Sequence, residues 1–470
     1  FIFYSFFFDL YRCILFKCLL KKQNYNTEDI FFHSLELNLK SRQYSIVDRH
    51  LGKVPDESEQ YNLKHTFLLS LSKRKILNPF NLKKKINYYK RLDQNIIFLD
   101  RYVTIRDIII FHYFLLKTYI KFKFFIKFDK IMNQTFHING INCNDILLSE
   151  LEQSFYGTFQ ENIYSALCFY NWSKQTENKI YVVNTLENLA ATRAIYYFAK
   201  KGNQNCKFVS IQHSEINSNK IEFINHKNEF QLSQSKFPSP VTDFYFVHGT
   251  RSFDIVSQYM PHQEISKIGC VKYDDFPSKI KNNKNIKLKI NNDLKLCEYF
   301  VVLIAPSIGV DFFNVLDVIK ELDFQKYKKK GVKFVLSPHM LFDKKQVIQY
   351  LDENSLNKNL IINYTYPSNE MIFSSNLLIT GYSSMAFESL IFGVPSIRVA
   401  PRNAIPLYDD LKEIPIAEST LELEKNIDFI LSDNYQMTNV NKMVEEHFYK
   451  IDGNSSKRFW VNLKENVMNQ

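Results

Sequence analysis

The sequence predicts an α/β protein with two Rossmann-like, doubly wound domains that face a cleft, and with helical extensions at both ends. Short apolar stretches alternate with helical patterns in the middle of the chain, and the alternation restarts nearer its end. Such alternation is typical of parallel sheets. A polar stretch rich in Lys and Asn at 279–296 separates the two regions and is predicted to be a linker. A chain of 470 residues has room for two or three domains.

The composition is that of a globular protein with an anionic partner. Apolar residues make up 45% of the chain and the formal net charge is +11, which suits a nucleotide, a phospholipid surface or a nucleic acid. Nucleic acid is not expected as a partner, because there is no arginine-glycine tract, zinc-finger spacing or RNA-binding signature. The seven cysteines are scattered without a C-x-x-C pair, which we interpret as reduced thiols in a cytoplasmic protein.

Residues 1–140 predict a helical and mixed region that belongs only in part to the first Rossmann-like domain. The opening 20 residues are very apolar, but Asp9, Arg12 and Lys17 interrupt them, so we expect a buried or interfacial helix rather than a membrane span. A second apolar stretch at 106–130 carries lysines among Phe, Tyr and Ile. It fits either a core helix whose lysines reach solvent or an amphipathic helix on anionic lipid.

Residues 141–285 predict the first complete Rossmann-like domain. A long helical pattern comes first, and the predicted strands follow at 179–185, 206–213, 241–249 and 265–270. The helix after the first of these strands ends at Gly202, with Lys200 and Lys201 in its last turn. Glycine is common at the end of a helix, and basic side chains in the last turn are stabilised by the negative end of the helix dipole.

Residues 290–470 predict the second Rossmann-like domain with C-terminal helices, and we place the boundary near residue 290. Its predicted strands include the stretches 299–307, 332–339, 360–364 and the apolar run that leads into Gly381. The tail at 420–470 has a mostly helical pattern and could pack back across the cleft.

The candidate donor site follows the strands of the second domain, because ligands of doubly wound sheets bind beyond the carboxyl ends of the strands. His339 suits contact with a diphosphate or a leaving group, and Glu388 suits ribose hydroxyls. A structural histidine and a surface glutamate are the alternatives. The full set is Ser307, His339, Gly381, Tyr382, Ser383, Ser384 and Glu388.

Ser383 and Ser384 stand where a predicted strand ends and a helix begins. The positive end of a helix with its N–H groups suits phosphate, although serine also serves as an ordinary helix cap. In the first domain, Glu187 and His213 follow predicted strands. Two ionisable groups there suit general-base catalysis on a hydroxyl nucleophile, and each alone could be a cap or a core hydrogen-bonding group.

Several catalytic motifs are missing from the sequence. It has no G-x-x-x-x-G-K-[ST], no G-x-G-x-x-G and no G-x-S-x-G, which argues against a P-loop ATPase, a dinucleotide fingerprint and an α/β-hydrolase. It also has no Asp-x-Asp pair, the simplest carboxylate clamp for a metal-bound nucleotide sugar, and no metal-ligand spacing stands out. We therefore predict no metal site and no cofactor.

The strand ends of the first domain carry Glu187-Asn188, Gln212-His213 and Gly249. In this pattern the region resembles the acceptor half of bacterial surface-polysaccharide glycosyltransferases of the GT-B fold. Ser214 is a departure, because the family often has glycine after the histidine. The Ser-Pro-His at 337–339 and the stretch ITGYSSMAFESLIFGVPSI resemble the donor half of GT-B enzymes that act on capsule, O-antigen or teichoic-acid precursors. The resemblance covers residues 179–405.

The resemblance implies a metal-independent glycosyltransferase that moves a sugar from a nucleotide-activated donor to a surface-glycan or lipid-linked acceptor. It implies that the two serines hold the donor phosphate and stabilise charge on the leaving group. A polyol-phosphate transferase, a nucleotide-sugar 2-epimerase and a non-catalytic glycan-binding protein are the alternatives. The expected location is the cytoplasm, with or without peripheral contact to the inner face of the cytoplasmic membrane.

Overall fold

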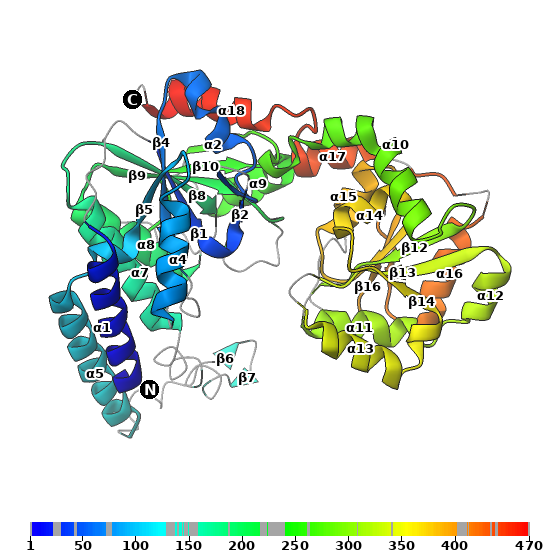
Figure 1. Cartoon of the computed structure of the whole chain (residues 1–470), viewed down its shortest axis with the longest axis horizontal. Coiled ribbons are helices and arrows are strands. Elements are labelled where there is room, and N and C mark those ends of the chain that lie inside the picture. The colour runs from blue at the N-terminus through cyan, green and yellow to red at the C-terminus, as the bar shows by residue number, and fades with distance from the viewer. Residues whose placement is uncertain are drawn as a thin grey trace.

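The computed structural model contains two parallel sheets, each the centre of one domain (Figure 1). The described residues are 2–21, 30–41, 45–71, 78–127, 137–138, 141–142, 144, 149, 158–186, 189–216, 223, 240–260, 264–307, 309–339, 342–401, 411, 413–432, 435–437 and 440–468. The predicted α/β class with two doubly wound domains is confirmed.

The first domain is built on a seven-stranded sheet in the order β11-β10-β9-β8-β1-β4-β5. All neighbouring strands are parallel. The strands are β1 (Ile30–Leu35), β4 (His65–Ser70), β5 (Asn95–Phe98), β8 (Ile180–Leu186), β9 (Cys206–Gln212), β10 (Phe244–Val247) and β11 (Glu264–Lys267). Residues 1–140 therefore contribute β1, β4 and β5, the three strands at one edge of this sheet.

Helices cover both faces of the first sheet, because adjacent residues of a strand point to opposite sides. Phe32 packs in the core beneath α4 with Leu82, whereas Phe31 packs in the core beneath α7 with Trp172. The helices are α1 (Ile2–Leu19), α2 (Val54–Glu57), α4 (Pro79–Tyr89), α5 (Ile105–Lys127), α7 (Thr158–Ser173), α8 (Ala190–Gly202) and α9 (Thr250–Tyr259). The helical turns are η1 (Glu36–Asn38), η2 (Ser58–Tyr61), η3 (Leu99–Tyr102) and η6 (Val271–Tyr273).

Two small antiparallel pairs accompany this domain. They are β2 (Leu39–Ser41) with β3 (Ile46–Asp48), and β6 (His137–Ile138) with β7 (Ile141–Asn142). Helix α5 has one buried side, with Ile108, His112 and Leu115, and one exposed side. No helix in the described part of the chain is both long and apolar enough to cross a bilayer.

The second domain is built on a six-stranded parallel sheet in the order β14-β13-β12-β15-β16-β17. Its strands are β12 (Phe300–Ile304), β13 (Val332–Leu336), β14 (Leu360–Ile362), β15 (Leu377–Thr380), β16 (Ser396–Val399) and β17 (Ile416–Ala417). Its helical elements are α11 (Val310–Ile319), α12 (Phe324–Lys329), α13 (Lys344–Glu353), η7 (Leu356–Lys358), α14 (Ser368–Met371), η8 (Ile372–Ser374), α15 (Met385–Ile391) and α16 (Thr420–Ile430). Alternate residues of β12 again enter different cores: Val302 lies in one and Leu303 in the other.

The predicted linker at 279–296 is wrong in its conformation, because most of it lies in helix α10 (Phe276–Asp293). Ile286 and Ile290 are four residues apart, so they share one side of the helix. That side packs against the core of the second domain. The prediction gave weight to the polar composition and overlooked this spacing.

The C-terminal tail returns to the first domain through α17 (Val440–Phe448), α18 (Ser455–Asn462) and a π-helical turn at Leu463–Met468. Phe459 and Trp460 lie in the core of the first sheet, and Trp460 Nε1 donates a hydrogen bond of 2.9 Å to Val54 O. The predicted unit 290–470 thus includes a helix that packs on the first domain. The division into 1–140, 141–285 and 290–470 remains a prediction.

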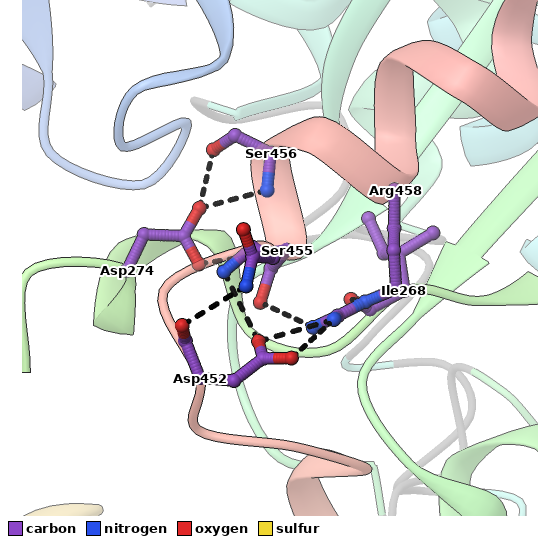
Figure 2. A network of polar contacts seen from close by, with 7 residues as sticks. Ile268, Asp274, Asp452, Ser455, Ser456 and Arg458 are labelled. Atoms are coloured by element: carbon purple, nitrogen blue, oxygen red, sulfur yellow. Dashed lines mark hydrogen bonds and ion pairs between the residues drawn. The ribbon is translucent and has the colours of Figure 1, made fainter. Parts of the chain in front are cut away.

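A buried carboxylate holds the start of α18 (Figure 2). Asp274 accepts hydrogen bonds from the backbone N–H of Ser455 and Ser456, at 2.8 and 2.7 Å, and from the Ser456 hydroxyl at 2.6 Å. Arg458 donates to Ile268 O and pairs with Asp452. A negative charge at a helix N-terminus is stabilising, so these contacts fix the tail to the segment that follows β11.

Candidate functional site

Each sheet has one position where the strand order reverses: between β1 and β8 in the first domain, and between β12 and β15 in the second. Ligands of doubly wound sheets bind beyond the carboxyl ends of the strands at this position. The segment after β1 leads through η1, β2 and β3 to Arg49 and His50, and β9 ends directly before His213. In the second domain, Ser307 follows β12 and Gly381 follows β15.

Arg49, His50 and His213 form a cluster in the first domain. The rings of His50 and His213 are 4.8 Å apart between centroids, at an angle of 74°. Arg49 Nε donates to His50 Nε2 at 3.2 Å. Burial lowers the pKa of His50, and together with the nearby His213, Arg49 and Lys272 it brings this pKa to about 3. The His50 imidazole is therefore neutral and surrounded by positive charge.

The positive charges of Arg49 and Lys272 also lower the pKa values of two more histidines. Burial lowers the pKa of His339, and so does the charge of Arg49, which belongs to the other domain. Burial and Lys272 lower the pKa of His248 to about 3. Two predicted site residues from different domains therefore lie near the cluster that contains Arg49. His213 of the first domain and Arg49 both act on His50, and Arg49 acts on His339 of the second domain. Positive charge beside neutral imidazoles is an environment that an anionic ligand stabilises, and here Asp48 interacts with Arg49.

A cavity of about 380 Å³ lies beside this cluster and is lined by both domains. Its basic lining residues are Lys40, Arg49, Lys53, Lys272 and Lys279, and its acidic ones are Asp48, Asp275 and Glu388. Lys53 pairs with Asp275 at 2.8 Å and Lys272 lies 3.7 Å from Glu388. Burial raises the pKa of Asp48, and the basic lining residues outnumber the acidic ones. The cavity therefore carries a net positive charge.

The turn after β15 is held by a carboxylate that sequence reasoning missed. Asp311 of α11 accepts hydrogen bonds of 2.8 Å from the backbone N–H groups of both Ser307 and Tyr382. A Cβ atom at Gly381 would lie 2.1 Å from Asp311 Oδ1, so this close approach requires glycine. Because Asp311 already accepts from the backbone N–H groups of Ser307 and Tyr382, a donor phosphate would contact other groups of this turn. The assignment of Ser307, Gly381 and Tyr382 to the donor site remains a prediction.

Ser383 contacts the first residue of α15, whose N-cap residue is Ser384. Its hydroxyl accepts a hydrogen bond of 3.3 Å from the backbone N–H of Met385. The Ser384 hydroxyl lies 3.5 Å from Glu388 Oε1, which also accepts a hydrogen bond of 2.8 Å from Tyr273 of the first domain. Glu388 therefore joins the two domains at the rim of the cavity, and a role of these side chains toward a donor remains a prediction.

Among the predicted residues, His213 lies beside His50, whereas Ser307, Gly381 and Tyr382 lie around Asp311. Glu187 lies outside the described residues. The residues that were missed are Arg49, His50 and Lys272. Arg49 and His50 were missed because neither β1 nor β3 was among the predicted strands. The apolar run IFFHSL at 30–35, flanked by polar segments, was the signal that could have found β1. Among the described residues, no group of three or more His, Cys, Asp or Glu side chains could hold a metal ion.

The buried histidines predict a loss of stability in acid. Burial lowers the pKa of His33 to about 4 and of His248 to about 3, below the value of about 6.5 in an unfolded chain. Below pH 6.5 the unfolded state therefore binds more protons than the native state. The free energy of unfolding consequently decreases as the pH is lowered. We expect a loss of up to about 2 kcal/mol per histidine between pH 7 and pH 5.

Urea denaturation at both pH values measures this loss. The double variant His33→Gln/His248→Gln should show a smaller change with pH than the wild type, whatever its stability at pH 7. An equal change in both proteins would contradict the neutral state of these two imidazoles.

A family model described as CDP-glycerol:poly(glycerophosphate) glycerophosphotransferase matches residues 160–464. No curated protein matches the chain. Among solved structures, UDP-GlcNAc 2-epimerase from Neisseria meningitidis is similar, with 12% identity and a TM-score of 0.52 over 93% of this chain and 100% of the epimerase. The wall teichoic acid polymerase TagF matches with 14% identity and a TM-score of 0.49, over 98% of this chain and 94% of TagF. The fold is GT-B-like, as the sequence predicted.

Proposed function

Because the chain belongs to the CDP-glycerol:poly(glycerophosphate) glycerophosphotransferase family, we propose that it transfers a polyol phosphate from a nucleotide-activated donor to the hydroxyl group of a cell-envelope polymer. This is the polyol-phosphate alternative considered from the sequence, and the family favours it over transfer of a sugar. The donor is a CDP-polyol and the acceptor is a growing polyol-phosphate or lipid-linked glycan. Such acceptors place the reaction at the inner face of the cytoplasmic membrane.

The observation that supports this proposal most is the meeting of Arg49, Lys272 and neutral imidazoles between the two switch points. A CDP-polyol carries a diphosphate, and its negative charge would compensate the positive charge found there. His339 and Arg49 approach this place from different domains, so the diphosphate would bridge them. Ser383 and Ser384 stand at the same strand ends of the second domain and would contact it through their hydroxyls.

The proposed reaction is one displacement at phosphorus. The acceptor hydroxyl oxygen attacks the phosphorus that carries the polyol, the bond from that phosphorus to the bridging oxygen breaks, and CMP leaves. His213 takes the hydroxyl proton, since it lies at the carboxyl end of β9 on the acceptor side. Arg49 and Lys272 stabilise charge on the phosphoryl oxygens. Positioning and electrostatic stabilisation of this kind account for most catalysis of phosphoryl transfer.

Donor binding tests the proposal directly. Calorimetry with CDP-glycerol, CDP-ribitol, UDP-glucose, UDP-GlcNAc and GDP-mannose should give binding only with the CDP-polyols. Tight binding of a UDP- or GDP-sugar without binding of either CDP-polyol would instead support the nucleotide-sugar donor expected from the resemblance. Absence of binding to every nucleotide would support a non-catalytic glycan-binding protein.

Replacing Ser383 and Ser384 together with Ala is expected to weaken CDP-glycerol binding by about tenfold to a hundredfold. Hydrogen bonds to charged groups contribute roughly 1.5–3 kcal/mol each, and the lost cap of α15 costs only about 1 kcal/mol of stability. The control is Ser419→Ala, which removes the cap that accepts from Glu422 N at the start of α16. If the double variant binds donor as the wild type does, the two serines have only a structural role.

A further inference from the structure

A buried ion pair holds the C-terminal tail against the segment that carries His213. Glu215 lies two residues after His213, and His447 lies in α17. His447 donates a hydrogen bond of 2.7 Å from Nδ1 to Glu215 Oε1. The His447 side chain is 0% exposed and that of Glu215 is 5% exposed. Because a buried charge without a partner is strongly disfavoured, this pair fixes the segment and the helix to each other.

The residues around His213 are held from a second direction as well. Gln212, the last residue of β9, donates hydrogen bonds of 2.9 Å from Nε2 to Ser214 O and to Ser252 Oγ. Its Oε1 accepts a hydrogen bond of 2.7 Å from the backbone N–H of His248. These bonds form inside the domain, since Gln212 is buried. The residue before His213 and the residues after it therefore have fixed positions.

His447 also contacts the second domain. Its ring packs against the ring of Phe387 in α15, with the two centroids 4.5 Å apart. Phe387 belongs to a hydrophobic cluster that both domains form, together with Tyr273 of the first domain and Met443 of α17. Helix α15 begins directly after the turn at 383–384. One imidazole thus contacts both the segment of His213 and the helix that follows the candidate donor turn.

The backbone of α17 approaches the end of β10 closely. A Cβ atom at Gly249 would lie 2.3 Å from Glu446 O and 2.6 Å from the carbonyl carbon of His447, so this approach requires glycine. Helix α17 packs on α9 of the first domain and on α15 of the second (Figure 1). Because no side chain separates the two backbones at Gly249, the packing of α17 on both domains determines the position of His447.

We propose that Glu215 and His447 are positioning residues for the transfer reaction, which hold His213 at a fixed place relative to the donor turn before α15. A general base must lie within hydrogen-bond reach of the proton that it takes. A displacement of about 1 Å at a catalytic group costs roughly a hundredfold in rate. The inference rests on the proposed function, in which His213 takes the proton of the acceptor hydroxyl.

Replacing both partners with apolar side chains tests this role. Such a replacement of a buried pair is often close to neutral for stability, so Glu215→Met/His447→Leu should fold. CMP release from CDP-glycerol in the presence of a glycerol-phosphate oligomer should slow by about tenfold to a hundredfold. Calorimetry should show an unchanged affinity for CDP-glycerol, because neither residue lines the cavity and leucine keeps an apolar contact with Phe387.

Asp9 of α1 and His112 of α5 provide the matched control. They also form a buried pair of a carboxylate and an imidazole in the first domain, with 3.0 Å between Asp9 Oδ2 and His112 Nε2, and neither lines the cavity. Asp9→Leu/His112→Leu should release CMP at the wild-type rate. His447→Asn is the conservative variant, because its amide N–H replaces the Nδ1 donor, and it should keep most of the wild-type rate.

Glu215→Gln is the second variant, which decides the question even when the double replacement does not fold. It keeps the size of the side chain and removes the charge, and a hydrogen bond without charge is roughly half as strong, so transfer should slow by about threefold to tenfold. A wild-type rate in both Glu215→Gln and the double variant would overturn the proposal. An equal loss of rate in the Asp9/His112 control, or a parallel loss of CDP-glycerol affinity, would overturn it too.

The same variants separate this inference from the proposed function. A wild-type protein that releases UDP from a nucleotide sugar, with CDP-glycerol left intact, would refute the proposed function. The positioning role would then be decided by the same comparison of variants on UDP release. A wild-type protein that releases no nucleotide from any donor would overturn both.

Discussion

Replacing His213 with Ala is expected to lower the rate of transfer by about 10²–10⁴-fold, the contribution typical of a general base. The affinity for CDP-glycerol should change little, because the proposed role of His213 concerns the acceptor proton. Arg49→Ala should behave differently: it removes a cation from the proposed diphosphate site and should weaken donor binding by about tenfold to a hundredfold. Single-turnover rates and calorimetry measure the two effects separately.

The contrast between these two variants decides the assignment. If His213→Ala transfers at the wild-type rate, the base is another residue, and Glu187 becomes the candidate. If Arg49→Ala binds CDP-glycerol as tightly as the wild type, the positive cluster is not the diphosphate site. His213→Gln, which keeps hydrogen-bonding groups but cannot act as a base near neutral pH, should be as slow as His213→Ala.

Replacing Trp460 with Ala is expected to reduce the free energy of unfolding by about 3–5 kcal/mol, the usual cost of deleting a buried aromatic side chain. Trp460 is fully buried, stacks on Tyr61 at 5.7 Å between ring centroids, and donates to Val54 O. The loss of stability should therefore affect the first domain, because Trp460 contacts Val54, which is more than 400 residues away along the chain. Urea denaturation followed by tryptophan fluorescence and circular dichroism measures it.

Leu421→Ala is the control for this prediction, because Leu421 is 78% exposed on α16 and surface substitutions usually change stability by less than about 0.5 kcal/mol. A loss below about 1 kcal/mol for Trp460→Ala would mean that the C-terminal helix is not part of the folding unit of the first domain.

The repeating part of the fold was predictable, since strands such as β9 and β13 are apolar runs that end in recognisable turns. The position of β1 was not. It lies between β4 and β8, and Phe31 is in register with both Thr66 and Val182, a pairing across about 150 residues that no local pattern encodes. The return of α18 to the first domain is hidden for the same reason, because Asp274 and Trp460 meet their partners only in the folded chain.

The residues of the candidate site that directly follow recognisable strands could be predicted from the sequence, whereas the others could not. His213 and His339 were found because they directly follow recognisable strands. Arg49 and Lys272 follow the three-residue strand β3 and the half-buried strand β11, so their charges could be located only once both domains were in place. Asp311 was missed because it is one helical residue among many, and its contacts with Ser307 and Tyr382 depend on the position of the first turn of α11 beside the segments that follow β12 and β15.

The identity of the nucleotide that leaves the donor tests the central claim most directly. Transfer of a polyol phosphate from a CDP-polyol breaks the bond between the two phosphates, so it releases a nucleoside monophosphate, whereas transfer of a sugar releases a nucleoside diphosphate. Incubation of the protein with CDP-glycerol and a glycerol-phosphate oligomer, followed by chromatography of the nucleotides, should yield CMP in step with lengthening of the oligomer. Release of a nucleoside diphosphate from a nucleotide sugar, with CDP-glycerol left intact, would contradict it.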